Sequence, residues 1–317
     1  GSVLLAVYPQ FNRGWKQFLN VLILFATSAF VYYCFTLRGN HEVFRYDLIY
    51  LAINAFLVII CFPIVFLLEK LFSLVSNFRL WELSDTNNQL LQELSLKAPG
   101  TFQHSLQVAS IAEDACKKIN ANAALVKVGA LYHDLGKMMN PSCFIENQTS
   151  QDGEFYHKKR SPKESAADII RHVSDGCEIA RKGHLPEIII DFILTHHGTD
   201  KVSFFYNQYC NQGGNPDDIE AFTYPGKKPQ TKEEAVLMLA DGVEAASRTL
   251  KEHNEENIRH LVNSIIQKRM DDGQLSVADI SLKDIDTVRE SFVSYLLQIY
   301  HGRIEYPKLK RRANRNA

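Results

Sequence analysis

Residues 132–137 read Tyr-His-Asp-Leu-Gly-Lys and close a stretch, 122–135, with the spacing of a helix. Neighbouring residues on a helix point about 100° apart, so His133 and Asp134 can converge only on a common centre beside it. An imidazole binds one metal ion, whereas a carboxylate has two oxygens and can bridge two ions about 3.5–4 Å apart. Gly136 is expected to end the helix. The hexapeptide therefore predicts a metal centre at a helix end.

The sequence around this hexapeptide, from residue 101 onward, has a helical pattern throughout. No convincing alternation typical of a strand is present. Two long stretches, 140–160 and 198–230, interrupt the helices, and loops of this length usually carry function. The pattern predicts an all-α domain over 101–305. Its expected helices span 101–119, 122–135, 162–173, 186–197, 215–221, 231–251, 254–271 and 281–301, and capping boxes are expected at Ser161 with Glu164 and at Thr231 with Glu234.

Further histidines and one aspartate lie on the other expected helices. Each of them, taken alone, is more often a satisfied core residue than a metal ligand. Asp241 stands among apolar residues, where a carboxylate must be paired or coordinated. The whole series has gaps of 29, 39, 24 and 44 residues, which place the ligands on separate helices, as an all-α metal cage requires. It comprises His104, His133, Asp134, His172, His196, His197 and Asp241.

The N-terminal part differs from the rest of the chain. Residues 18–37 and 48–68 contain no charged side chain. As helices they would each span about 30 Å, the thickness of a hydrocarbon core. We predict that they are two transmembrane helices, which form a membrane hairpin within a segment 1–75; a pair of buried core helices is the alternative. The basic residues around the stretches favour cytoplasmic ends for the hairpin.

Two further segments flank the expected all-α domain. One amphipathic helix is expected over 70–97, and we predict a connector segment over 76–100. It could be a rigid connector, a dimerisation helix or a simple spacer. Residues 306–317 form a basic tail, which could be solvated or could touch anionic lipid head groups.

The composition excludes several classes of protein. Hydrophobic residues make up 46% of the 317 residues and charged residues 22%, which rules out a collagen-like or wholly disordered chain. The 35 basic and 36 acidic residues leave a net charge of −1, so no global basic field indicates a nucleic acid polymer as partner. The six cysteines form no C-x-x-C pair, which argues against a disulfide framework and a zinc ribbon. A reducing compartment is therefore the default expectation.

The ordered histidines and aspartates resemble those of the HD-domain phosphohydrolases, a superfamily defined by an H…HD…D pattern. His172 and the pair His196-His197 resemble the ligands of its two-metal subset. Together with the predicted hairpin, two motifs make essentially the whole chain similar to the seven-transmembrane HD-domain cyclic di-AMP phosphodiesterases of bacteria (the PgpH type). The two expected spans resemble the last two of seven. The motifs are Gly176-x-Glu178-Ile179-Ala180-Arg181 and Tyr224-Pro225-Gly226-x-Lys228-Pro229-Gln230.

The resemblance implies a metal centre, a reaction and a location. One metal ion would be held by His104, His133, Asp134 and Asp241, and the other by Asp134, His172, His196 and His197. Iron or manganese is implied, and a ligand set of nitrogen and oxygen without thiolate agrees with either. The enzyme would hydrolyse cyclic di-AMP to linear pApA. It would belong to the bacterial cell membrane as a multi-pass protein, with the HD domain in the cytoplasm.

Three residues of the hexapeptide are candidate catalytic residues. His133 and Asp134 would hold the metals, and Asp134 together with Asp241 would orient the nucleophile and tune the metals. Lys137 could neutralise a non-bridging phosphate oxygen or the leaving group. Alternatively, Lys137 is a lysine at a helix end that pairs with Asp134.

Three further residues are candidate substrate contacts. Tyr224 and Lys228 lie in an aromatic and basic loop, residues 222–228, which could stack on adenine or could simply pack onto the domain. Arg248 lies about two turns beyond Asp241 on the same expected helix face. It could clamp a phosphate or form an ordinary salt bridge.

Other functions stay open at this point. Another HD activity, on cyclic di-GMP, guanosine tetraphosphate or a deoxynucleoside triphosphate, is the nearest alternative, followed by a membrane receptor that binds a nucleotide without turnover. The cyclic di-GMP branch typically has Gly-Tyr-Pro after its metal histidines, whereas Gly198-Thr199-Asp200 follows His197 here. The expected partners are cyclic di-AMP and the lipid bilayer, and a homodimer is left open.

Overall fold

The computed structural model describes residues 16–36, 41–72, 74–148 and 153–301. The chain divides into two compact units, 1–82 and 83–317. Within the described ranges the regular elements are helices, and β-pairing consists of an isolated bridge between Lys201 and Thr223. The prediction of an all-α fold is therefore confirmed. The predicted domain boundaries at 75, 100 and 305 stay predictions, and the basic tail lies outside the described residues.

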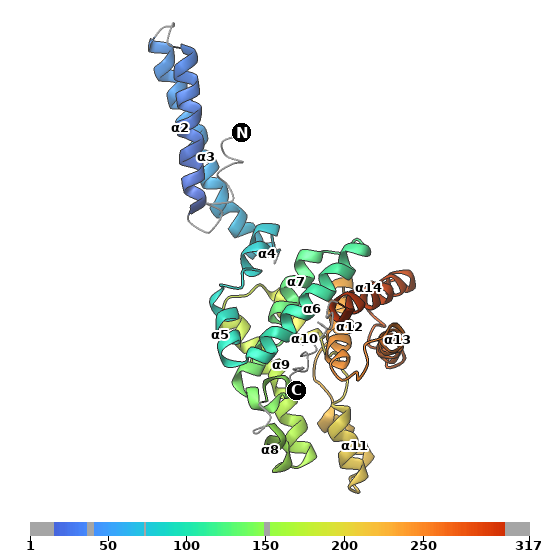
Figure 1. The fold of residues 1–317 in the computed structure, drawn as a ribbon. Coiled ribbons are helices and arrows are strands. Elements are labelled where there is room, and N and C mark those ends of the chain that lie inside the picture. Colours follow the sequence, from blue (N-terminus) through green and yellow to red (C-terminus); the bar gives the residue numbers. More distant parts are fainter. Residues whose placement is uncertain (1–15, 37–40, 73, 149–152, 302–317) are drawn as a thin grey trace, which may run out of the picture. The chain divides into compact units, whose positions relative to one another are not determined.

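The first unit contains the long helices α2 (Lys16–Thr36) and α3 (His41–Phe72), followed by α4 (Asn77–Leu83). Helices α2 and α3 pack side by side (Figure 1). The Tyr32 hydroxyl donates a hydrogen bond to the Asp47 carboxylate and ties the two helices together. Large apolar side chains on both helices are exposed, among them Leu22, Phe30, Tyr46, Ile49, Tyr50, Ile53, Phe56, Leu57, Leu67 and Leu71.

The two predicted membrane spans are not confirmed. Residues 18–36 fall in α2 and residues 48–68 fall in α3, whereas residue 37 lies outside the described residues. Among the helices that the structure describes, none has the length and apolar character needed to cross a membrane.

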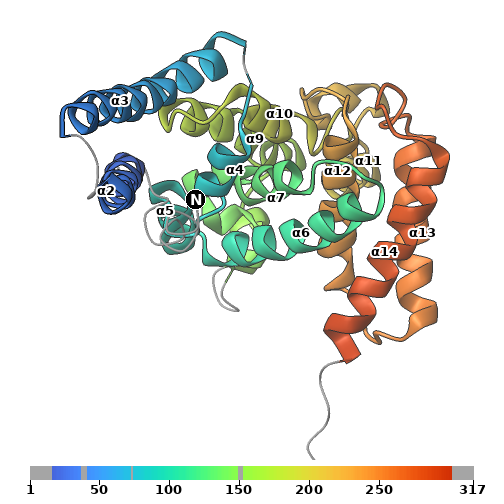
Figure 2. The ribbon, with the colours of Figure 1, turned by 90° about the horizontal axis from the view of Figure 1, so that it is seen from above.

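The second unit is built around α6 (Pro99–Lys118), which contacts α5 (Gln89–Lys97), α7 (Ala123–Tyr132), α12 (Lys232–Ser247) and α14 (Leu282–His301). Helix α9 (Pro162–Lys182) packs on α10 (Glu187–Thr195), and α13 (Glu255–Asp271) packs on α12 and α14 (Figures 1 and 2). The core between these helices is apolar and includes Ile111, Val126, Leu131, Phe192, Leu239 and Phe292. Shorter elements connect them: η2 (Leu135–Met139), η3 (Pro141–Cys143), η4 (Ile145–Asn147), α8 (Gly153–Lys158), α11 (Ser203–Asn211) and η5 (Pro216–Phe222).

The sequence signals for two helix starts are confirmed. The Ser161 and Thr231 side chains accept hydrogen bonds from the backbone amides of Glu164 and Glu234, and both glutamates complete capping boxes. These caps fix the starts of α9 and α12, two of the helices that carry predicted ligands.

Several predicted elements differ from the structure. The helix expected over 70–97 is broken, because α4 ends at Leu83 and the Asn88 side chain caps a new helix, α5. The helix expected over 162–173 continues to Lys182. Part of the stretch 198–230, expected to be irregular, forms helix α11.

Gly136 has a different role from the one expected. Helix α7 already ends at Tyr132, and Gly136 lies inside the 3-10 helix η2, with no left-handed backbone conformation. A Cβ on Gly136 would lie 1.8 Å from the backbone oxygen of His172 and 2.6 Å from the amide nitrogen of Gly176. Gly136 therefore allows η2 to press directly against the backbone of α9, and this contact sets the separation between Asp134 and His172.

We predict that Gly136→Ala destabilises the second unit, because backbone atoms of α9 cannot move aside as a side chain could. The free energy of unfolding should fall by about 1–3 kcal/mol or more, measured by denaturant unfolding of the full chain. Gly242→Ala is the control, since its Cβ would meet the side-chain methyl Cγ2 of Ile265 at 3.2 Å. It should change stability much less; equal losses in the two variants would contradict this account of Gly136.

Candidate metal centre

Five helices and the turns that follow two of them bring the seven predicted ligands to one place. His104 lies in α6, His172 in α9 and Asp241 in α12, whereas His133-Asp134 and His196-His197 directly follow α7 and α10. His197 is half-buried, and the other six are buried. Their donor atoms form overlapping groups in which all atoms lie within 4.8 Å of one another. The clustering expected from the sequence is therefore present in the fold.

The first group consists of His104, His133 and Asp241. Nε2 of His104 lies 2.9 Å from Oδ1 of Asp241, and Nε2 of His133 lies 3.8 Å from the same oxygen. Burial lowers the pKa of His133, but the charges of Asp134 and Asp241 outweigh it and raise that pKa to about 10. Two buried imidazole nitrogens thus face one buried carboxylate oxygen.

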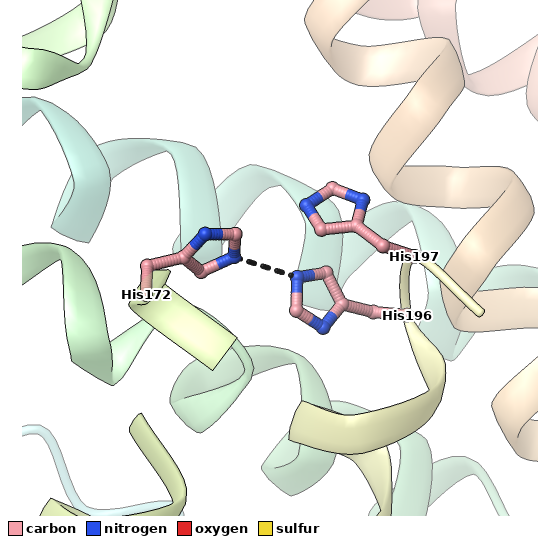
Figure 3. A group of neighbouring side chains, drawn as sticks. All are labelled: His172, His196 and His197. Carbon is pink, nitrogen blue, oxygen red and sulfur yellow. Dashed lines mark hydrogen bonds between the residues drawn. The ribbon is translucent and has the colours of Figure 1, made fainter. Parts of the chain in front are cut away.

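The second group consists of His172, His196 and His197 (Figure 3). The Nε2 atoms of His172 and His196 lie 3.2 Å apart and point toward each other. Burial lowers the pKa of His172, and burial together with the neighbouring His133 lowers the pKa of His196 to about 3. These imidazoles are therefore neutral at pH 7, which is the protonation state in which histidine binds a metal.

Asp134 lies between the two groups and divides its oxygens between them. Oδ2 lies 3.1 Å from Nε2 of His133 and 3.7 Å from Nε2 of His104. Oδ1 lies 3.5 Å from Nε2 of His172 and 3.6 Å from Nε2 of His196. One carboxylate therefore offers one oxygen to each histidine group.

Backbone carbonyls orient three of the imidazoles. Nδ1 lies within hydrogen-bond distance of the carbonyl three residues earlier in His133 (2.7 Å), His172 (2.6 Å) and His196 (2.8 Å). In a neutral ring, an Nδ1–H that donates to this carbonyl leaves Nε2 without a proton and directed inward. The local helix backbone thus prepares these three residues as ligands through Nε2.

The polar atoms at the centre fit a metal better than a closed hydrogen-bond network. Nε2 of His133 and Oδ1 of Asp134 are buried, and no hydrogen bond reaches either atom within the described part of the chain. Buried polar atoms without partners are rare and costly. The donors are imidazole nitrogens and carboxylate oxygens, which suit first-row transition metals. The buried His/Asp groups are therefore consistent with a metal site.

Lys137 approaches this centre from η2. Its ammonium nitrogen lies 2.8 Å from Oδ2 of Asp134 and 2.8 Å from Oε1 of Glu146. Burial lowers the pKa of Lys137, but the Asp134 and Glu146 carboxylates reverse this and raise it above its usual value. Lys137 is therefore a permanently charged cation beside the site, which leaves both of its predicted roles open.

The predicted substrate contacts have different surroundings. Tyr224 is buried, and its ring stacks on the His197 imidazole with centroids 4.2 Å apart. Lys228 is half-buried four residues further along the same loop. Arg248 donates hydrogen bonds to the Glu244 carboxylate. Substrate contact by each of the three stays a prediction.

Two carboxylates at the site were not identified from the sequence. Glu146 contacts Lys137, and Glu244 contacts His104. Glu244 is far from His104 in the sequence, so no local pattern indicates their contact. Its position three residues after Asp241 does place these two carboxylates on one helix face. Glu146 lies in a stretch without helical periodicity, and its partner could be found only from the fold.

The chain thus has the features of one class of protein, the all-α domains that carry a buried metal site of histidine and aspartate side chains. The sequence model of the HD domain matches residues 101–246. Two crystal structures of the L. monocytogenes phosphodiesterase PgpH HD domain each cover 68% of this chain, with a TM-score of 0.64. The first is 39% identical with all of that chain covered, and the second, in complex with cyclic-di-AMP, is 41% identical with 99% covered. The chain therefore belongs to the HD domain family.

Curated relatives extend the similarity over 76% of the chain. Cyclic-di-AMP phosphodiesterase PgpH of Bacillus subtilis is 42% identical over 240 residues, and its counterpart in Listeria monocytogenes is 42% identical over 242 residues. An uncharacterised protein of Synechocystis is 42% identical over 246 residues. The chain spans about a third of the length of these relatives, 33%, 33% and 30% respectively.

Proposed function

We propose that this chain is a metal-dependent phosphodiesterase that hydrolyses cyclic di-AMP to linear pApA. The observation that carries the proposal is the position of Asp134, whose two oxygens face two separate histidine groups. A carboxylate so placed suits a pair of metal ions that act on one phosphodiester. The similarity to relatives named cyclic-di-AMP phosphodiesterase PgpH, and to an HD domain crystallised with cyclic-di-AMP, supports the substrate.

The proposed ligand sets follow the two groups. His104, His133, Asp134 and Asp241 would hold one ion, and Asp134, His172, His196 and His197 the other. Iron or manganese suits these nitrogen and oxygen donors. When bound, such a pair supplies Lewis-acid stabilisation of the phosphoryl oxygens and lowers the pKa of water for the attack.

The protein's own groups have separate proposed tasks. Asp134 and Asp241 would orient the nucleophile and tune the ions that they help to hold. Lys137, held by Asp134 and Glu146, places a positive charge where negative charge develops on the phosphate. Tyr224 and Lys228 belong to a loop that borders the site, because the Tyr224 ring stacks on His197. An aromatic ring there could also meet a base.

Removal of the shared carboxylate should test the metal pair. We expect Asp134→Ala to empty at least one of two metal positions and to abolish turnover, because both groups lose an oxygen donor. Elemental analysis of the purified chain should give about two transition-metal ions before the substitution and one or none after it. Asp114→Asn is the control, because Asp114 pairs with Lys118 on the surface of the same domain. An active wild-type protein with one metal or none would contradict the two-metal proposal.

The substrate is tested by a panel of nucleotides. We expect turnover of cyclic di-AMP to exceed that of cyclic di-GMP, with pApA as the product by chromatography. Stacking alone tolerates any base, so the preference requires hydrogen bonds to the adenine edge. Equal rates on both dinucleotides would contradict the preference but not the phosphodiesterase chemistry. Binding of cyclic di-AMP by the metal-loaded chain without turnover would favour a receptor instead.

We also propose that the α2–α3 hairpin contacts a lipid bilayer and that the HD domain lies on its cytoplasmic side. Two observations support the contact. The stretches 18–37 and 48–68 contain no charged residue, and the hairpin exposes large apolar side chains such as Phe30 and Phe56. Apolar surface of this extent is stable only when another apolar phase covers it. A lipid bilayer would provide that phase.

Vesicle retention tests the hairpin. We expect the full chain to stay with phospholipid vesicles through an alkaline carbonate wash and to need detergent for release. The double substitution Phe30→Arg and Phe56→Arg should weaken retention, because a charge within the bilayer costs about 2.5–3.5 kcal/mol. Phe204→Arg is the matched control, since Phe204 is a similarly exposed aromatic residue in the other unit. Release of the wild-type chain by carbonate alone would refute the proposal.

A further inference from the structure

His104 differs from its neighbours in the partner of its outer nitrogen. His133, His172 and His196 each direct Nδ1 to the backbone carbonyl three residues earlier. Nδ1 of His104 instead makes a short contact with Oε2 of Glu244, a side chain 140 residues further along the chain. A charged carboxylate thus takes the place of a neutral carbonyl at this one histidine.

Glu244 is itself held firmly in place. Its side chain is 1% exposed. Its second oxygen, Oε1, accepts hydrogen bonds from Nε and a terminal nitrogen of Arg248 at 2.8 and 2.5 Å. A buried carboxylate is tolerated only when it is paired and hydrogen-bonded. The Glu244 oxygens are thus divided between one imidazole and one guanidinium.

One face of α12 carries the whole arrangement. Asp241 and Glu244 lie in α12, and Arg248 is its C-cap residue with helical dihedral angles, so the spacings of three and four residues place all three along one side. Asp241 faces Nε2 of His104 at 2.9 Å, while Glu244 contacts Nδ1 of the same ring. A single helix therefore supplies a proposed ligand, the partner of the neighbouring ligand and the cation that fixes this partner.

We propose that Glu244 is a positioning residue for His104, which it holds as an Nε2 ligand of the metal ion shared with His133, Asp134 and Asp241. The carboxylate accepts the Nδ1–H proton and so fixes the ring orientation, the tautomer and the electron-rich character of Nε2. The hydrogen bonds from Arg248 hold the Glu244 carboxylate in this position. The proposal rests on the proposed metal centre and assigns a function to two residues that need not touch the substrate.

To test this, the metal-free full chain is titrated with Mn²⁺. Binding is measured by calorimetry and by the electron paramagnetic resonance signal of free Mn²⁺. Glu244→Gln keeps the size of the side chain but removes its charge. We expect it to weaken the binding of one of the two ions by about 10–100-fold and to leave the other ion unchanged. Glu113→Gln is the matched control, because Glu113 lies on the same helix as His104 and pairs with the surface residues Lys117 and Lys127.

Arg248→Gln provides a second, milder variant that leaves both Glu244 and His104 intact. We expect it to weaken the same ion as Glu244→Gln does, by a smaller factor. Unchanged affinity for both ions in Glu244→Gln would overturn the proposal, and so would an equal loss of both ions together with a lower melting temperature, because that pattern belongs to a general structural role. A wild-type chain that takes up no Mn²⁺ would instead overturn the metal centre itself.

Discussion

The second unit depends on one buried charge, the carboxylate of Asp134. Its side chain is buried among His104, His133, His172 and His196, and Lys137 adds an ion pair from η2. Isolation of such a charge from water would cost several kcal/mol. The surrounding histidines and Lys137 hold the pKa of Asp134 well below its usual value although burial opposes this. The groups that compensate for this charge come from α6, α9, η2 and the turns that follow α7 and α10.

Close backbone packing makes this compensation geometrically feasible. The contact of Gly136 with the His172 carbonyl and the Gly176 amide brings η2 onto α9, and a side chain at Gly136 would push the two apart. With η2 and α9 this close together, Nε2 of His172 lies 3.5 Å from Oδ1 of Asp134. Gly176 belongs to one of the two motifs that carry the resemblance to the family. The structure explains why glycine stands there, because the backbone of Gly176 packs closely against the backbone of Gly136.

Much of this arrangement could be predicted from the sequence, and the misses have physical reasons. The ligand series was visible because polar residues on apolar helices stand out, and the starts of α9 and α12 follow from local hydrogen bonds of Ser161 and Thr231. Helix α11 was missed because it is short and fully buries only Phe205, with Tyr206 and Tyr209 partly buried beside it. Glu244 was missed because its role depends on a contact with His104 that only the tertiary fold creates. Local sequence patterns indicate contacts between residues that are close in the sequence, whereas Glu244 contacts a residue that is far from it in the sequence.

The two histidine groups are not equivalent, although one carboxylate joins them. The first combines two imidazoles with Asp241 and an Asp134 oxygen, and Glu244 adds a further negative charge behind His104. The second offers three imidazoles and a single Asp134 oxygen. Asp134 and Asp241 outweigh burial and raise the pKa of His133, whereas burial and the neighbouring His133 lower the pKa of His196. Carboxylate-rich sites suit harder cations and imidazole-rich sites suit later transition metals. Two ions held here would therefore differ in affinity and electrophilicity.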